Sequence, residues 1–119
     1  MAKSTGKSGP ETVICTYRIK TGREAAFLKL LRRHWPTLRQ LGLATGEPSM
    51  VFRGADKSKK PFFIEIFAWK SGVAVATAHQ SPEVMAVWEA MGQHTEARLG
   101  RPAMEFPHVE PVRLKFAKT

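Results

Sequence analysis

Hydrophobic and polar residues alternate with a period of two at positions 13–20, which predicts a β-strand. Residues 47–53 predict a second, shorter strand, and the charged, turn-rich residues 54–60 predict a hairpin loop. Residues 61–69 are apolar at nearly every position. Such a run is typical of a central strand with both faces covered. In the first strand, the more apolar face consists of Val13, Cys15, Tyr17 and Ile19.

Apolar residues three and four positions apart then predict a helix that ends near Leu41. Thr21 is placed to cap its start, and Gly42 is a natural residue to follow its end. Pro36 lies inside the pattern, so we expect a kink or a break there. The apolar stripe consists of Phe27, Leu30, Leu31, Trp35 and Leu38.

A second helical region covers residues 71–80 and restarts at Ser81-Pro82-Glu83, an N-cap serine followed by proline and an acidic first turn. We expect it to end near Gly100. Its stripe consists of Val84, Val87, Trp88 and Met91. Residues 103–109 predict a last strand, and Pro107 indicates that this strand lies at an edge or contains a bulge.

The predicted order is β-α-β-β-α-β, which indicates an α+β, ferredoxin-like fold. In this fold an antiparallel four-stranded sheet carries its helices on one face. We predict a disordered N-terminal tail at residues 1–10, a single domain at 11–112 and a basic C-terminal tail at 113–119.

The strand at 61–69 predicts how the two sheet faces are covered. Its aliphatic side, Phe62, Ile64, Ile66 and Ala68, is suited to the helices. Its other side carries Phe63, Glu65, Phe67 and Trp69, an aromatic patch larger than monomers usually expose. We therefore expect a second subunit to stack on the aromatic side, giving a homodimer.

Composition narrows the function classes. The chain has 119 residues and a formal charge of +9, which first suggests nucleic acid. Five of the nineteen basic residues lie in the two tails, however, and three more lie in the 54–60 loop, so the excess is largely terminal and loop charge. No apolar run approaches the roughly 20 residues of a membrane span.

The absence of an apolar segment in the first ten residues predicts a cytoplasmic protein. A single cysteine, Cys15, excludes an intrachain disulfide and is best interpreted as a buried small hydrophobic residue.

An RNA-recognition motif has the same element order, so it is an alternative. Its third strand carries a glycine-containing aromatic signature that Lys59-Lys60-Pro61-Phe62-Phe63 lacks. Glu65 is predicted to lie on the face that would stack bases, where a carboxylate repels phosphate. We therefore expect nucleic acid to be an unlikely partner.

Several segments between residues 12 and 111 resemble the dimeric α/β-barrel superfamily, and within it the antibiotic-biosynthesis-monooxygenase-like domains. They are the Lys-Thr-Gly-Arg-Glu turn after the first strand, Phe-Ala-Trp-Lys-Ser at 67–71, and Ala-His-Gln-Ser-Pro-Glu-Val at 78–84. The resemblance implies a homodimer with a small-molecule pocket and no cofactor.

The resemblance also implies what the pocket does. Some members are cofactor-free monooxygenases that oxidise electron-rich aromatic compounds. Haem-degrading members use an Asn, a Trp and a His, and Thr16, Ala78 and Trp88 stand near those positions here, which argues against haem. We predict a cofactor-independent oxygenase for a small aromatic compound. The alternatives are a non-catalytic small-molecule-binding dimer and an RNA-binding module.

Glu65 and His79 are the candidate catalytic residues. A carboxylate among aromatic rings is suited to a general base, although it could instead pair with Arg18 or with the partner subunit. His79 lies at the helix break, where it could face a pocket or donate to a backbone carbonyl. The candidate substrate-binding residues are Arg18, Phe63, Phe67, Trp69 and His108.

The remaining histidines, His34 and His94, have the spacing of helix-surface residues. The four histidines are far apart in the sequence and form no ligand pair, so we expect no metal site.

Overall fold

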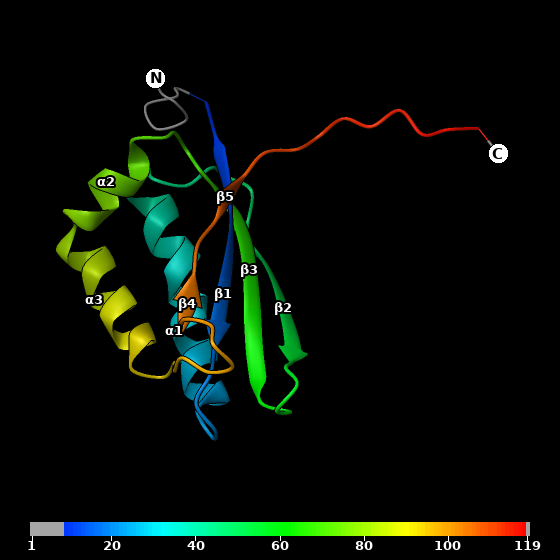
Figure 1. Cartoon of the computed structure of the whole chain (residues 1–119). Helices are drawn as coiled ribbons and strands as arrows, with labels where there is room; N and C mark the ends of the chain where they lie inside the picture. The colour runs from blue at the N-terminus through cyan, green and yellow to red at the C-terminus, as the bar shows by residue number, and fades with distance from the viewer. Residues whose placement is uncertain (1–8, 119) are drawn as a thin grey trace.

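A computed structural model describes residues 9–118, and its strands form one antiparallel sheet in the order β2-β3-β1-β4, with β5 also pairing with β1 (Figure 1). The helices lie together on one side of this sheet. The elements are β1 (Glu11–Arg18), α1 (Glu24–Gln40), β2 (Met50–Ala55), β3 (Pro61–Trp69), α2 (Ala74–His79), α3 (Pro82–Gly92), β4 (Met104–Glu105) and β5 (His108–Val109). The predicted ferredoxin-like α+β fold is confirmed.

Pro107 interrupts the last strand as predicted. It separates β4 from β5, and both short strands pair with β1. The carbonyl of Pro107 still accepts a hydrogen bond from the backbone N–H of Ile14 at 3.0 Å. Proline lacks an N–H but keeps its carbonyl, so it can contribute one side of the pairing at a sheet edge.

The predicted helix ends are partly right. The cap at Thr21 is wrong, because α1 begins after Arg23 and no side chain caps it. Pro36 lies inside α1 without dividing it. Gly42 follows the end of α1 with a φ of +75°, a conformation that favours glycine.

The second helical region is broken where the sequence predicts, but its limits are narrower. α2 begins at Ala74, not Ser71, and α3 ends at Gly92 rather than near Gly100. The Ser81 hydroxyl accepts a hydrogen bond from the N–H of Val84 at 3.3 Å, which confirms the predicted cap.

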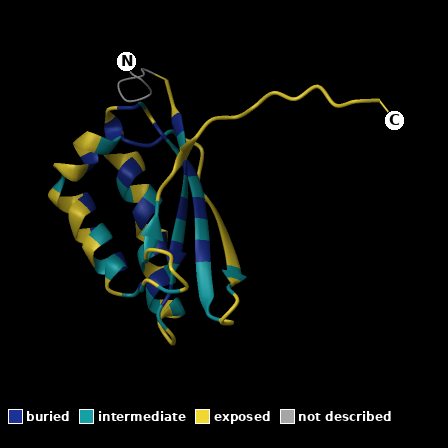
Figure 2. Ribbon diagram, viewed as in Figure 1, coloured by how far each residue is buried: buried dark blue, intermediate teal, exposed yellow. Residues whose placement is uncertain are grey.

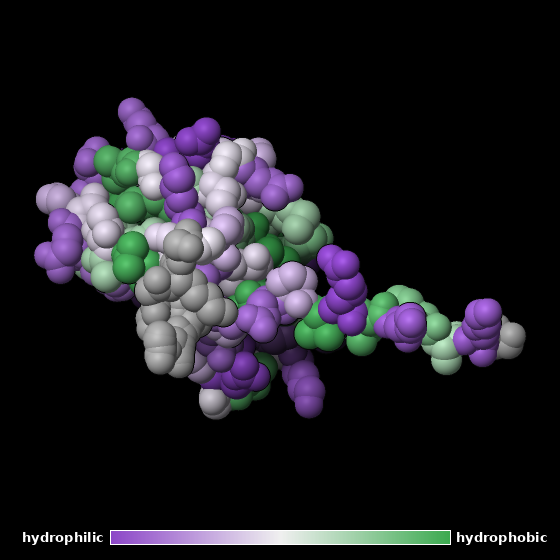
Figure 3. Space-filling view, turned by 90° about the horizontal axis from the view of Figure 1, so that it is seen from above, coloured by the Kyte–Doolittle hydropathy of each residue, from purple (hydrophilic) through white to green (hydrophobic). Residues whose placement is uncertain are grey.

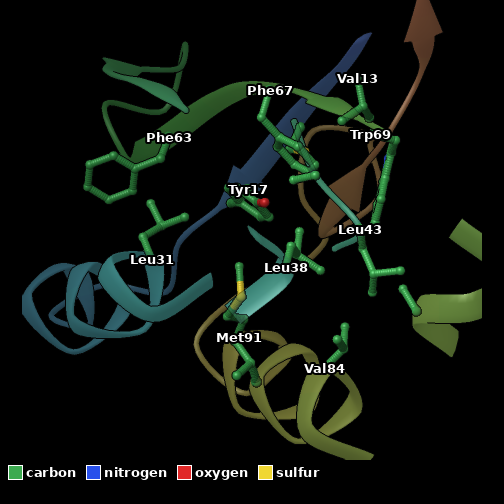
Figure 4. Packing of buried hydrophobic residues seen from close by; sticks show 14 of the residues in the cluster. Val13, Tyr17, Leu31, Leu38, Leu43, Phe63, Phe67, Trp69, Val84 and Met91 are labelled. Carbon is green, nitrogen blue, oxygen red and sulfur yellow. The ribbon is translucent and has the colours of Figure 1, made fainter. Parts of the chain in front are cut away.

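The prediction for the two faces of β3 is wrong. In the register with β1, Glu65 lies opposite Cys15 and Phe67 lies opposite Val13, and this face turns towards the helices. Phe63, Glu65, Phe67 and Trp69 are all at most 5% exposed. Figure 2 shows the resulting alternation of buried and half-buried residues along β1 and β3, and Figure 4 shows the labelled aromatic residues among side chains from the helices. The ring of Phe63 stacks on that of Phe27 from α1, with centroids 5.8 Å apart.

The opposite sheet face therefore carries the aliphatic side of β3. Ile66 pairs with Ile14 and Met50, and Ile64 pairs with Thr16 and Phe52. Met50 and Phe52 are about half exposed. We call this the open face, defined by Ile14, Thr16, Met50, Phe52, Phe62, Ile64, Ile66 and Ala68.

Residues 110–118 continue from β5 without helix or strand and extend away from the helices, beyond the sheet (Figure 1). Val112, Leu114 and Phe116 are 76%, 64% and 84% exposed. Figure 3 shows hydrophobic and hydrophilic side chains next to one another along this segment. The N-terminal tail predicted at residues 1–10 lies mostly outside the described residues.

None of the helices within residues 9–118 combines the length and the apolar character needed to cross a membrane.

Candidate functional site

A cavity of about 280 Å³ lies between the sheet and the helices. Its size is near the lower end for small-molecule sites, which suits a compact ligand. Its walls are almost entirely apolar or aromatic. The lining residues are Val13, Cys15, His34, Phe67, Trp69, Val75, His79, Trp88, Met104, Phe106 and His108.

Four of the residues singled out from the sequence meet at this cavity: Phe67, Trp69, His79 and His108. The rings of Phe67 and Trp69 contact edge to face, with centroids 5.2 Å apart. His79 and His108 are exposed residues as well as lining ones, so they lie where the cavity meets solvent. His108 Nδ1 is 2.9 Å from a carboxylate oxygen of Glu11.

The other three candidates do not line the cavity. Phe63 packs in the core beside Phe27. Arg18 lies on the other side of the sheet and pairs with Glu105 at 2.9 Å, so it is not the partner of Glu65. Glu65 is completely buried and lies one hydrogen bond behind the cavity wall.

A chain of hydrogen bonds connects Glu65 to the cavity. The Tyr17 hydroxyl donates to Glu65 Oε1 at 2.7 Å, and His34 Nδ1 is 2.9 Å from the same oxygen. Trp88 Nε1 donates to His34 Nε2 at 2.9 Å. His34 and Trp88 both line the cavity, so the chain runs from the centre of the sheet to the ligand space.

This chain determines the tautomer of His34. An indole N–H can only donate, so Nε2 must supply a lone pair to Trp88. The remaining proton of His34 is therefore on Nδ1, from which it is donated to Glu65. Glu65 Oε1 accepts from two donors, as a carboxylate does, and Oε2 has no hydrogen-bond partner within the described part of the chain.

The neighbouring groups remain protonated. Burial and the nearby Glu65 carboxylate raise the pKa of the Tyr17 hydroxyl well above its ordinary value. The same two causes, burial first, raise the pKa of the Cys15 thiol. Tyr17 is thus a permanent donor, and Cys15 behaves as the buried small residue that the sequence predicts.

Two residues of this site, His34 and Trp88, could not be assigned to it from the sequence. His34 was predicted to lie on a helix surface, yet it is 3% exposed. The spacing of Leu31, His34 and Leu38 could have placed it on the buried stripe of α1. Trp88 belongs to the predicted apolar stripe of the second helical region, and in the structure it is a half-buried wall of the cavity, 5.0 Å from His79 and 6.4 Å from Trp69 between ring centroids.

Within residues 9–118, no three His, Cys, Asp or Glu side chains are grouped so that they could hold a metal ion.

The fold and this site can be compared with known proteins. No protein-family model matches the sequence, and no curated protein matches it. Solved structures match the fold. A crystal structure of an antibiotic biosynthesis monooxygenase is 17% identical, with 87% of this chain and 99% of that chain covered and a TM-score of 0.65.

Two further solved structures have the same architecture. A single-residue variant of SnoaB, a cofactor-independent oxygenase from Streptomyces nogalater, is 13% identical over 88% of this chain and 95% of its own, with a TM-score of 0.61. Rv0793 from Mycobacterium tuberculosis is 15% identical over 89% and 98%, with a TM-score of 0.60. At these identities the comparison establishes a shared fold, that of antibiotic-biosynthesis-monooxygenase-like domains, which confirms the resemblance seen in the sequence.

Proposed function

We propose that this protein binds a small aromatic compound in the cavity and oxidises it with dioxygen, without a cofactor. The observation that carries the proposal is the cavity itself, in which aromatic walls adjoin the buried pair of Glu65 and His34. The walls suit a flat, apolar ring system. A basic group beside such a ring can remove a phenolic or enolic proton, and the resulting electron-rich anion can reduce dioxygen.

The proposed reaction converts an anthrone-type phenol and one dioxygen into a quinone and one water. The base removes a proton from the substrate, and the anion passes electrons to dioxygen. One oxygen atom then forms a bond to the ring carbon. The O–O bond breaks, and the second oxygen leaves as water with the two hydrogens lost from the substrate. The substrate supplies all the electrons, so no external reductant is needed.

Oxygen uptake tests this function. Purified protein with anthrone as the probe should consume one dioxygen per molecule oxidised and form anthraquinone. Glu65→Gln and His79→Ala should each lower the rate, because both residues are candidate catalytic groups. His94→Ala is the matched control, because His94 does not line the cavity and contacts Arg23 instead. Binding without any oxygen uptake would contradict the oxygenase and leave a non-catalytic binding protein.

We also propose that two copies associate through their open faces. Met50 and Phe52 are about half exposed on this face and the adjoining Ile64 and Ile66 are half-buried, so the open face carries apolar side chains of the kind that mark an interface. Residues 110–118 extend on the same side of the sheet and could reach about 30 Å if fully extended. Their exposed Val112, Leu114 and Phe116 recur every second residue, so one side of this segment can bury apolar surface against a second copy.

Static light scattering tests the dimer. The wild-type chain should have twice the monomer mass, and Ile66→Glu should give a folded monomer because it places a charge at the centre of the interface. Met85→Glu is the matched control, because Met85 is also exposed but lies on α3. A chain ending at residue 111 should dimerise more weakly. A wild-type monomer at micromolar concentration would contradict the proposal.

The predicted position of Glu65 on an RNA-binding face is wrong. Glu65 instead lies on the helix side, completely buried. That nucleic acid is not a partner therefore remains a prediction. An electrophoretic shift with single-stranded RNA that weakens with salt would contradict it.

A further inference from the structure

We propose that His34 Nε2 accepts the proton of a ligand hydroxyl, and that Trp88 occupies this position until the ligand arrives. The inference rests on the proposed aromatic ligand and assigns the base to a residue that sequence reasoning placed on the surface. Its ligand class is a phenol or enol, because such a hydroxyl can replace the indole N–H as the hydrogen-bond donor and is also acidic enough to transfer its proton to an imidazole.

His34 is held in one orientation. Its Nδ1 is 2.9 Å from Glu65, and its ring contacts Phe67 edge to face with centroids 5.7 Å apart. The side chain is 3% exposed, and rotating its ring would break the buried hydrogen bond to Glu65. Nε2 consequently points in a fixed direction, and Trp88 is the partner it has there.

Trp88 has more freedom. It is half-buried, and it lines two hollows: the cavity of about 280 Å³ and a smaller void of about 20 Å³ beside Met91 and Met104. A side chain with empty space beside it can change rotamer without displacing a packed neighbour. The hydrogen bond between Trp88 and His34 is therefore the one in this chain that a ligand can replace.

The proton transfer is balanced within the site. The ligand O–H bond breaks, an N–H bond forms at His34 Nε2, and the anion of the ligand accepts a hydrogen bond from the new N–H. The Glu65 carboxylate stabilises the positive imidazole through Nδ1, as a carboxylate behind a catalytic histidine does. Glu65 can do so because its own Oε1 is also held by Tyr17.

Other titratable groups face this region from every neighbouring element. They are Tyr17 and Cys15 on β1, Glu65 on β3, His79 on α2, and His108 with its partner Glu11 at the cavity edge. Tyr17 and Cys15 stay protonated. His79 and His108 are exposed, so they are the groups that a test must separate from His34.

The probe is 4-nitrophenol, whose ionised form has its own absorbance band, measured below the pKa of the free phenol. Bound to the wild-type chain, it should ionise about tenfold more than free in the same buffer, the equivalent of one pKa unit. His34→Gln and Glu65→Gln should each abolish this enhancement, whereas His94→Ala, at a histidine outside the cavity, should retain it. Loss of the enhancement in His79→Ala or His108→Ala but not in His34→Gln would assign the proton to one of those two residues instead. 4-Nitroanisole, which lacks the hydroxyl, should bind wild type and His34→Gln equally.

Trp88→Phe tests the displaced hydrogen bond while keeping an aromatic wall. It should tighten nitrophenol binding by about threefold to tenfold, because no hydrogen bond to His34 must be broken first. Trp35→Phe is the matched control, because Trp35 on α1 lies outside the cavity and its buried Nε1 has no partner among the described residues.

Four results would overturn the inference: bound nitrophenol that stays neutral in wild type, equal ionisation in His34→Gln, unchanged affinity in Trp88→Phe, or no binding of either probe. Its failure can be distinguished from failure of the oxygenase. Enhanced ionisation without oxygen uptake would keep His34 as the proton acceptor and contradict only the oxygenase. Oxygen uptake that survives in His34→Gln would keep the oxygenase and contradict only the role of His34. If His34→Gln does not fold, Glu65→Gln and Trp88→Phe keep the test decisive.

Discussion

The two faces of the same sheet differ in what they bury. On the helix side, β3 contributes Phe63, Phe67 and Trp69, together with Glu65, and all four are nearly inaccessible. On the open face the neighbouring residues of the same strand, Ile64 and Ile66, are only half-buried. One strand of nine residues thus supplies both a core with a ligand cavity and an apolar surface that no helix of residues 9–118 covers.

The difference between the two faces explains how the buried carboxylate of Glu65 is stabilised. Glu65 lies on the crowded face, where Tyr17 from β1 and His34 from α1 can both reach its oxygen. Arg18, which lies on the opposite side of β1, pairs with Glu105 at the sheet edge instead. Buried polar groups are tolerated where hydrogen-bond partners converge, and for Glu65 they converge under the helices.

The largest expected effect compares two adjacent phenylalanines. Phe63→Ala should lower the free energy of unfolding by about 3–5 kcal/mol, because it leaves a hole beside Phe27 in a closed core. Phe62→Ala, on the open face, should cost about 1 kcal/mol or less. Urea denaturation at a protein concentration where the chain is monomeric measures both, and equal losses would contradict the assignment of the faces.

A smaller effect concerns Gly54, which lies opposite Phe62 in the sheet. An added Cβ at Gly54 would overlap the tip of the Phe62 ring. Gly54→Ala should therefore lower the free energy of unfolding by about 1–2 kcal/mol, because the Phe62 ring must leave its position over Gly54.

The double variant with Phe62→Ala should recover most of that loss, since the clash then disappears. Gly92→Ala serves as the control, because its Cβ would meet nothing closer than 3.8 Å. If Gly54→Ala lowers the free energy of unfolding equally in wild type and in Phe62→Ala, the two residues do not interact.

The smallest expected effect on stability concerns Asp56, in the turn between β2 and β3. Its polar contacts lie near the surface, unlike the buried hydrogen bonds of Glu65. Hydrogen bonds from the Ser58 hydroxyl and from Arg98 hold the pKa of Asp56 well below its ordinary value. Arg98 also donates to the carbonyls of Ile19 and Pro61, so Asp56 helps to fasten the turn.

A folded-state pKa below the unfolded value means that ionised Asp56 stabilises the fold. This contribution is present above the unfolded pKa of about 3.9 and is lost as the pH falls towards the folded value. Asp56→Asn should be less stable than wild type by a constant amount between about pH 5 and 8, and the difference should shrink below about pH 4. Chemical denaturation at each pH measures the difference in free energy of unfolding between wild type and Asp56→Asn. If this difference grows as the pH falls, ionised Asp56 does not stabilise the fold.

The elements of this fold could be predicted because their signals are local. The alternation at residues 13–20, the stripe of α1, the Ser81-Pro82 restart and the break at Pro107 all appear in the structure. The errors at Thr21 and Ser71 are errors of helix ends, where a residue suited to capping is not bound to be used.

The candidate site was predicted only in part. Phe67, Trp69, His79 and His108 line the cavity, but they were found as aromatic or titratable residues near element ends. His34 was predicted to lie on the surface because it is a single histidine in a basic helix. Its spacing from the buried residues Leu31 and Leu38 is the signal that places it on the buried side of α1. Glu65 was singled out correctly as unusual, and its partner was wrong because Arg18 projects from the other side of β1.

The sequence by itself determined the order of strands and helices, most of their ends to within a few residues, and which residues of each strand share a face. These properties depend on neighbours two to four positions away. Only the tertiary structure decided which face the helices cover, and with it the position of the cavity and the contact between Glu65 and His34. Period-two alternation distinguishes two faces without saying which lies inside, and that choice depends on how large aromatic side chains from β1, β3 and α1, far apart in the chain, fill one shared volume.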